Sequence, residues 1–165
     1  MQSLSGAKTM TLSIIGPERY DLAVRPDGYA VRCEMGFEKF SGLAARRIPK
    51  LYVISVDEWP VYVGITRTRL SARFRLGWRG NGRHGYHGYK WRDRITAAKV
   101  DIWGQEQPEP IPNEILDIEV IEAEVVFLIR QAGQWPEYQT EIHFHRSSEE
   151  HRHWAAEIMG RYRAR

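Results

Sequence analysis

The sequence predicts an α/β protein of the α+β type, in which a small, mostly antiparallel central sheet of about three strands is flanked by helices. Two observations favour this class. Short apolar runs rich in β-branched residues, at Leu51–Val56 and Val61–Thr66, have the alternation that is typical of strands. Longer segments carry apolar residues at helical spacing, and the longest lies within Ile115–Ala132. A sheet covered by helices fits this order of elements.

An N-terminal β-rich extension, residues 1–48, is expected before a main domain of residues 49–165. Met10–Gly16 and Tyr29–Phe37 have strand-like sequences. A short helix is expected within Ser41–Ile48, begun by its serine. The main domain is expected to form one compact unit that includes a C-terminal strand and helix.

Within the main domain, the first two strands are expected to form a hairpin, because only four residues separate them. Thr66 or Thr68 is expected to cap the helix that follows. The sequence then predicts a helix at Thr68–Trp78, a strand at Lys99–Gly104 and a long helix within Ile115–Ala132. A further strand is predicted at Thr140–His145. The last helix is predicted to begin at a capping box, Ser147–Glu150, and to end at about Tyr162.

The composition limits the class of protein. Hydrophobic residues make up 42% of the 165 residues, which is enough for a real core. Cys33 is the only cysteine, so an intrachain disulfide is excluded and a reducing compartment is expected. No apolar run approaches the roughly 20 residues of a membrane span, and the N-terminal sequence lacks the apolar stretch of a secretory signal. We therefore expect a soluble cytoplasmic protein with no membrane partner.

The charges are unevenly distributed along the chain. Arg67–Arg94 holds nine basic residues and one acidic residue, whereas Gln105–Ile129 holds seven acidic residues and no basic ones. The net charge of +3 therefore hides a strongly basic segment. Such a segment suits a polyanion, so nucleic acid is the expected partner. The alternatives are an ordinary solvated surface and an interaction domain whose acidic stretch binds a basic protein.

Two short motifs and a later segment resemble the GIY-YIG nuclease superfamily. "LYVI", which begins at Leu51, and "YVG", at Tyr62–Gly64, are similar to its two signature strands. "LSAR", at Leu70–Arg73, matches the L-x-x-R of its first helix, and Glu122–Gln139 resembles its later helix with a Pro-x-Tyr ending. The resemblance implies a metal-dependent endonuclease that hydrolyses phosphodiester bonds of DNA.

The resemblance also implies the roles of individual residues. Tyr52 and Tyr62 would orient or deprotonate the attacking water, and Arg73 would bind the phosphoryl oxygens through its planar donor fork. Glu124 would hold one hard divalent ion, Mg²⁺ or alternatively Mn²⁺. Glu122 competes with Glu124 for this role, and the register of the helix favours Glu124.

The glycine-rich segment Arg79–Arg92 is expected to be a functional loop. Many family members have a histidine or tyrosine four residues after the arginine, where this chain has Gly77. His87 is the expected substitute in proton transfer, because imidazole exchanges protons near neutral pH. Phosphate contacts, base stacking and close approach to nucleic acid are expected from Gly64, Arg67, Arg69, Arg75, Tyr86, Tyr89, Lys90, Trp91, Arg92 and Gln139.

Two positions depart from the family's pattern. The first motif opens on glycine in the family and on Leu51 here, and the asparagine after Pro-x-Tyr is Gln139 here. The alternative function is therefore a non-catalytic nucleic-acid-binding module on the same fold. A zinc site at His143 and His145 is a weaker hypothesis, because structural zinc sites usually include cysteines.

Overall fold

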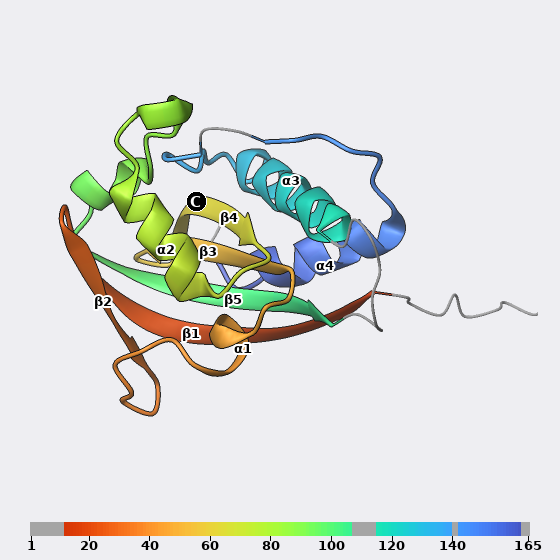
Figure 1. Cartoon of the computed structure of the whole chain (residues 1–165). Helices are drawn as coiled ribbons and strands as arrows, with labels where there is room; N and C mark the ends of the chain where they lie inside the picture. Colours follow the sequence, from red (N-terminus) through yellow and green to blue (C-terminus); the bar gives the residue numbers. More distant parts are fainter. Residues whose placement is uncertain (1–11, 107–114, 140–141, 163–165) are drawn as a thin grey trace, which may run out of the picture.

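The computed structural model describes residues 12–106, 115–139 and 142–162, and in this part of the chain five strands form one antiparallel sheet (Figure 1). The strand order is β2-β1-β5-β3-β4. The strands are β1 Ser13–Arg25, β2 Gly28–Cys33, β3 Lys50–Val56, β4 Trp59–Thr66 and β5 Ala97–Glu106. The helices are α1 Gly42–Ala45, α2 Leu70–Arg79, α3 Leu116–Gln131 and α4 Glu149–Met159, with short 3₁₀ turns η1 Arg83–Gly85 and η2 Lys90–Asp93.

The α+β class is confirmed, but the prediction of about three strands is wrong. Only β3, β4 and β5 come from the predicted main domain, and β1 and β2 complete the same sheet. β1 is a 13-residue strand that pairs with β2 on one side and with β5 on the other, and Tyr20 lies opposite Val100. The N-terminal segment therefore belongs to the sheet, because one long alternating strand can form ladders along both of its edges.

Two other local predictions are wrong. Residues 142–145 form no strand, while Thr140 and Glu141 lie outside the described residues. The helix α2 has Arg69 at its N-cap, and the hydroxyls of Thr66 and Thr68 lie 2.9 Å apart in a hydrogen bond with each other. The threonines thus order the turn before the helix instead of capping it.

The sheet separates two apolar cores, because successive residues of a strand point to opposite faces. Tyr52 and Ile54 of β3 point toward α1 and α2, where they pack with residues such as Phe74. Leu51 and Val53 point the other way, where they pack with residues of α3 and α4 such as Ile121 and Ile158. The first face carries many aromatic side chains, and the candidate site is built at its edge.

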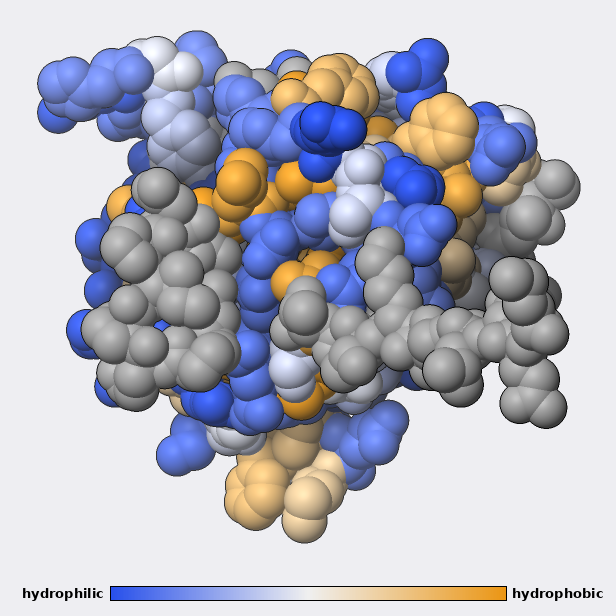
Figure 2. Space-filling model, turned by 90° about the vertical axis from the view of Figure 1, so that its right-hand side faces the viewer, coloured by the Kyte–Doolittle hydropathy of each residue, from blue (hydrophilic) through white to orange (hydrophobic). Residues whose placement is uncertain are grey.

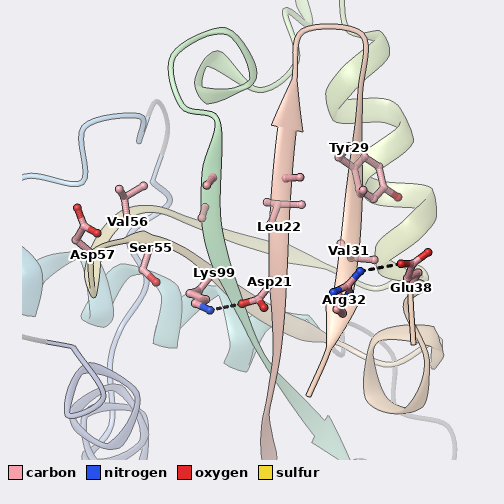
Figure 3. Close-up of a pocket in the computed structure, with 14 residues that line it drawn as sticks. Asp21, Leu22, Tyr29, Val31, Arg32, Glu38, Ser55, Val56, Asp57 and Lys99 are labelled. Atoms are coloured by element: carbon pink, nitrogen blue, oxygen red, sulfur yellow. Dashed lines mark hydrogen bonds and ion pairs between the residues drawn. The ribbon is translucent and has the colours of Figure 1, made fainter. Parts of the chain in front are cut away.

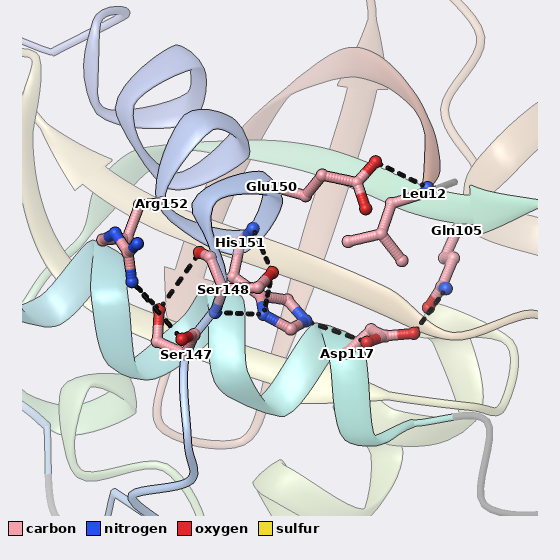
Figure 4. A network of polar contacts seen from close by, with 8 residues as sticks. All are labelled: Leu12, Gln105, Asp117, Ser147, Ser148, Glu150, His151 and Arg152. Carbon is pink, nitrogen blue, oxygen red and sulfur yellow. Dashed lines mark hydrogen bonds and ion pairs between the residues drawn. The ribbon is translucent and has the colours of Figure 1, made fainter. Parts of the chain in front are cut away.

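A polar network joins the two C-terminal helices to the sheet (Figure 4). The predicted capping box lies one residue further on: the Ser148 N–H donates to His151 Nδ1 at 3.0 Å, and the His151 N–H donates to Ser148 Oγ. Because Nδ1 accepts this hydrogen bond, Nε2 carries the proton and donates to Asp117 Oδ1 at 2.8 Å. Asp117 Oδ2 accepts from Gln105 of β5 at 3.1 Å. The network holds α4 against α3 and the sheet.

The surface is mixed in character. On the face drawn in Figure 2, hydrophilic residues predominate and apolar residues lie in separate small groups. Among the described residues, no helix is both long enough and apolar enough to cross a membrane.

Candidate functional site

Two tyrosines on neighbouring strands meet across a glycine. Tyr52 of β3 lies opposite Gly64 of β4, and Tyr62 lies two residues before Gly64 on the same face. A Cβ at position 64 would lie 2.5 Å from the Tyr52 hydroxyl oxygen and 2.8 Å from Tyr62 Cε1. Gly64 therefore leaves the space in which the Tyr52 ring crosses β4. The two ring centroids are 6.0 Å apart.

A third tyrosine reaches this pair from the glycine-rich loop. The hydroxyls of Tyr89 and Tyr52 share a hydrogen bond of 2.6 Å. The Tyr89 ring occupies the place of a side chain on α2, since a Cβ at Gly77 would lie 2.6 Å from Tyr89 Cζ. The position that lacks the expected histidine or tyrosine is thus filled by Tyr89. His87, the residue predicted for this role, lines a different cavity beside the loop.

Arg73 of α2 contacts two aromatic side chains of the same loop. Its Nη1 donates to the Tyr86 hydroxyl at 2.6 Å. Its guanidinium carbon lies 4.9 Å from the centre of the Tyr89 ring and 5.7 Å from the centre of the Tyr86 ring. These contacts orient the cation, because a guanidinium is attracted to the face of an aromatic ring.

Burial keeps the three neighbouring phenols in their neutral form. It raises the pKa of Tyr52, Tyr62 and Tyr89 well above the ordinary value of 10, and the positive charge of Arg73 opposes this rise in each case. A phenolate that removes a proton from water, which was one expectation for this pair, is therefore disfavoured. Neutral hydroxyls can still orient a water through hydrogen bonds, and Tyr62 is the member of the original pair that borders a cavity.

That cavity, which we call the tyrosine–glutamate cavity, has a volume of about 370 Å³. Tyr62, Arg73 and Tyr86 line one part of it. Glu119 and Glu122 of α3 line another part, and their spacing of three residues places both on one side of the helix. The cavity thus brings a cation, phenols and carboxylates together from segments that are far apart in the chain. The full lining is Tyr62, Ile65, Arg73, Tyr86, Gly88, Tyr89, Lys90, Ile115, Glu119, Glu122, Tyr138, Gln139 and His143.

The expected metal ligand, Glu124, does not line this cavity. It lies two residues after Glu122, which is roughly 200° further around the helix. Glu122 does line it, and only 6% of its surface is exposed. The placement favours Glu122 over Glu124. Because α3 is buried on more than one side, its apolar pattern does not distinguish the two registers.

The carboxylates fit a hard divalent ion whose coordination is completed by other oxygens. Glu122 and Glu119 offer oxygen donors, which suit Mg²⁺ and Mn²⁺. Within the described ranges, no three histidine, cysteine or acidic residues are grouped so as to hold an ion by themselves. Mg²⁺ commonly binds through one or two carboxylates together with water and phosphate oxygens. The arrangement therefore fits an ion that is shared with a phosphate.

The loop residues predicted to contact nucleic acid have two kinds of position. Tyr86, 41% exposed, and Lys90 lie at the cavity and can reach a ligand. Trp91 is fully buried, and Tyr89 is nearly so and stacks on it, which leaves neither ring a face for a base. Arg92 is engaged by the protein itself, since it donates to the carbonyl oxygens of Gly77, Gly80 and His87.

The other residues that were predicted to contact nucleic acid also differ in position. Gln139 lines the cavity, and its side-chain amide pairs with both backbone groups of Val63 at 2.9 and 3.0 Å, which fixes the preceding turn to β4. Gly64 is buried behind the tyrosines. Three basic side chains are exposed but do not line the cavity; these are Arg67, Arg69 and Arg75.

Sequence reasoning missed Glu119, His143 and Tyr138 as cavity residues. The spacing of Glu119 and Glu122 was a usable signal, because residues three apart share a helix face. His143 and Tyr138 lie in segments without regular structure, where periodicity carries no information.

A larger cavity of about 700 Å³ lies elsewhere and contains none of the predicted site residues (Figure 3). It is an open part of the sheet surface along β2, β1, β5 and the end of β3. Most of its charged side chains form pairs, Lys99 with Asp21 and Arg32 with Glu38, while Asp57 lines its far end without such a pair among the described residues. This pairing is typical of a solvated sheet face, so the smaller cavity is the better candidate for chemistry.

Comparison of the chain with models of known protein families, with curated proteins and with solved structures gives no match in any of the three.

Proposed function

We propose that the protein is a divalent-metal-dependent endonuclease that hydrolyses phosphodiester bonds of DNA, with chemistry of the GIY-YIG type. One observation carries this proposal: Tyr62 of β4, Arg73 of α2 and Glu122 of α3 line a single cavity. These are the side chains that hydrolysis of a phosphodiester needs, namely a group to orient water, a cation for the phosphoryl oxygens and a carboxylate for a metal ion.

We assign one role to each of the three. The hydroxyl of Tyr62 orients the attacking water, while Tyr52, which is fully buried and packs beside the Tyr62 ring, acts through Tyr62 as a positioning residue. Arg73 meets the developing negative charge of the phosphoryl group from the side of α2. Its contacts with Tyr86 and Tyr89 hold it in place before the substrate arrives, so little reorganisation is needed.

Glu122, together with Glu119, would hold Mg²⁺ on the side of α3. When bound, the ion supplies positive charge to the phosphate and assists the departure of the leaving oxygen. Lys90 at the cavity adds a further cation for the nucleic-acid backbone, which is consistent with the basic character of Arg67–Arg94.

Supercoiled plasmid and structured single strands, incubated with and without Mg²⁺ or Mn²⁺, provide the first test. We expect cleavage only when a divalent ion is present. Arg73→Gln should lower the rate about a hundredfold or more, as the loss of an aligned charge donor does in other enzymes. Arg79→Gln is the matched control, since Arg79 is exposed on the same helix and does not line the cavity. A wild-type protein that binds DNA but cuts it with neither ion would support the binding-module alternative.

A further inference from the structure

A second cavity of about 470 Å³ adjoins the tyrosine–glutamate cavity. Tyr89, Lys90 and Tyr138 line both of them, so the two cavities meet along a ridge formed by these residues. We call the second one the flanking cavity. A ligand that extends beyond the first cavity across this ridge enters the second.

The walls of the flanking cavity come from two segments that the protein holds firmly. On one side, Arg92 fixes the loop through its three hydrogen bonds to backbone carbonyl oxygens. On the other side, the Tyr138 N–H donates to Val61 O at 3.0 Å, next to the Gln139 amide that pairs with β4. The Tyr138 ring is half-buried and therefore keeps an accessible face. A fixed aromatic ring of this kind is a platform on which a base can stack.

The charges of the flanking cavity suggest how a nucleotide would be oriented. Lys90 stands on the ridge, and Arg94 lines the cavity beside Tyr138. Two carboxylates, those of Asp93 and Glu137, line it as well. Carboxylates repel phosphate but accept hydrogen bonds from the amino groups of bases. A base inside the cavity and its phosphate at Lys90 on the ridge satisfy both conditions.

The size of the flanking cavity favours a single nucleotide. Its volume falls within the range of about 300–1,000 Å³ that small-ligand sites occupy. A base in a continuous duplex remains stacked and offers only its edges in the grooves, so it enters a concave pocket only after it has left the stack. The base must therefore be unpaired or must become unpaired on binding.

We propose that the flanking cavity receives one unstacked nucleotide next to the scissile phosphate, so that the substrate is nucleic acid with an unpaired nucleotide at the cleavage point. This inference rests on the proposed function, because it takes the scissile phosphate to lie in the tyrosine–glutamate cavity. Tyr138 stacks on the base, and Lys90 and Arg94 contact its phosphate.

The test measures binding without metal, so that it does not depend on cleavage. Three otherwise identical duplexes are compared. The first has one bulged nucleotide, the second has the same bulge without its base, and the third has no bulge. We expect the wild-type protein to bind the complete bulge about tenfold more tightly than the abasic one, which is a usual effect of one stacking contact. 2-Aminopurine at the bulge should change its fluorescence on binding. Equal affinities for the complete and abasic bulges would overturn the inference without the need for any variant.

Tyr138→Leu should remove the preference for the complete bulge over the abasic one. Trp135→Leu is the matched control, because Trp135 is an exposed aromatic residue just before the same turn and does not line the flanking cavity. A Tyr138→Leu protein that keeps the full preference would also overturn the inference.

The same duplexes with Mg²⁺ separate the two proposals. If the protein binds the complete bulge more tightly than the abasic one but cleaves neither, the flanking cavity remains a nucleotide site and the nuclease is refuted. Cleavage at equal rates with and without the bulged base would leave the nuclease and refute this subsite. Binding to none of the duplexes would refute both.

Discussion

Gly64 offers a direct test of the way the two strand tyrosines are packed, through the substitution Gly64→Ala. The new Cβ would lie 2.5 Å from the Tyr52 hydroxyl oxygen and 2.8 Å from Tyr62 Cε1. Carbon atoms prefer about 3.5–4.0 Å, so one or both rings must move by roughly 1 Å. Tyr52 has little room for this movement, because it is fully buried, packs against Phe74 and shares a short hydrogen bond with Tyr89.

The magnitude follows from two effects. Overpacking a core costs about 1–3 kcal/mol, and a lost buried hydrogen bond adds about 1 kcal/mol. We therefore expect Gly64→Ala to lower the free energy of unfolding by about 2–4 kcal/mol. For a domain of this size the melting temperature should fall by roughly 5–15 °C. Nucleic-acid cleavage measured well below that temperature should fall as well, because Tyr62 is displaced from the cavity.

Thermal unfolding followed by circular dichroism measures the effect. Gly28→Ala is the matched control, since a Cβ at Gly28 would meet nothing within 4 Å. Tyr52→Val makes space for the new methyl group. The double variant should therefore lose less unfolding free energy than the sum of the losses in the two single variants. A Gly64→Ala protein as stable as the Gly28→Ala control would refute this account of the tyrosine packing.

Three further predictions concern single residues. Tyr52→Phe should slow cleavage about tenfold or more without changing the Mg²⁺ concentration required, because it removes the hydroxyl that bonds Tyr89 beside Tyr62 and removes no metal ligand. A changed Mg²⁺ requirement would contradict this. Arg92→Ala should make the loop more sensitive to limited proteolysis than Arg94→Ala does, because Arg92 ties the loop carbonyl oxygens of Gly80 and His87 to that of Gly77 in α2; equal sensitivity would contradict its role. Burial lowers the pKa of Lys50 to about 8 from 10.5, so between these pH values the unfolded chain binds more protons than the folded chain. The free energy of unfolding should therefore rise with pH across this window. Urea unfolding should show a flatter pH dependence for Lys50→Met than for the wild type, and an equal slope would contradict the shift.

The hairpin could be predicted from sequence because its signals are local. Its apolar alternation gave Leu51–Val56 and Val61–Thr66, close to the observed β3 and β4. The long helix was predictable for the same reason, with observed bounds Leu116–Gln131. Tertiary pairing was not predictable in this way. The sequence of β1 does not indicate that this strand lies between β2 and β5. The predicted number of strands was wrong for this reason.

The candidate site shows the same division between local and tertiary information. The pairing of Tyr52 with Gly64 is local to the hairpin, although its register includes a one-residue shift between Ile54 and Ser55 that spacing alone does not give. The position of Tyr89 is not local, because it depends on the way a glycine-rich loop folds back on Gly77 of α2. The choice between Glu122 and Glu124 required the rotation of α3 about its axis, and a helix buried on several sides leaves that rotation open in the sequence.

The most direct test of the central claim compares Glu122→Gln with Glu124→Gln in Mg²⁺-dependent plasmid cleavage, with the Mg²⁺ concentration varied. Both substitutions remove one negative charge from the same helix and keep the shape of the side chain, but only Glu122 lines the cavity. We expect Glu122→Gln to cleave about a hundredfold more slowly or worse, with partial rescue at high Mg²⁺. Glu124→Gln should stay within about twofold of the wild-type rate, as substitutions away from a site usually do. Wild-type activity in Glu122→Gln, or a loss confined to Glu124→Gln, would contradict the proposed site.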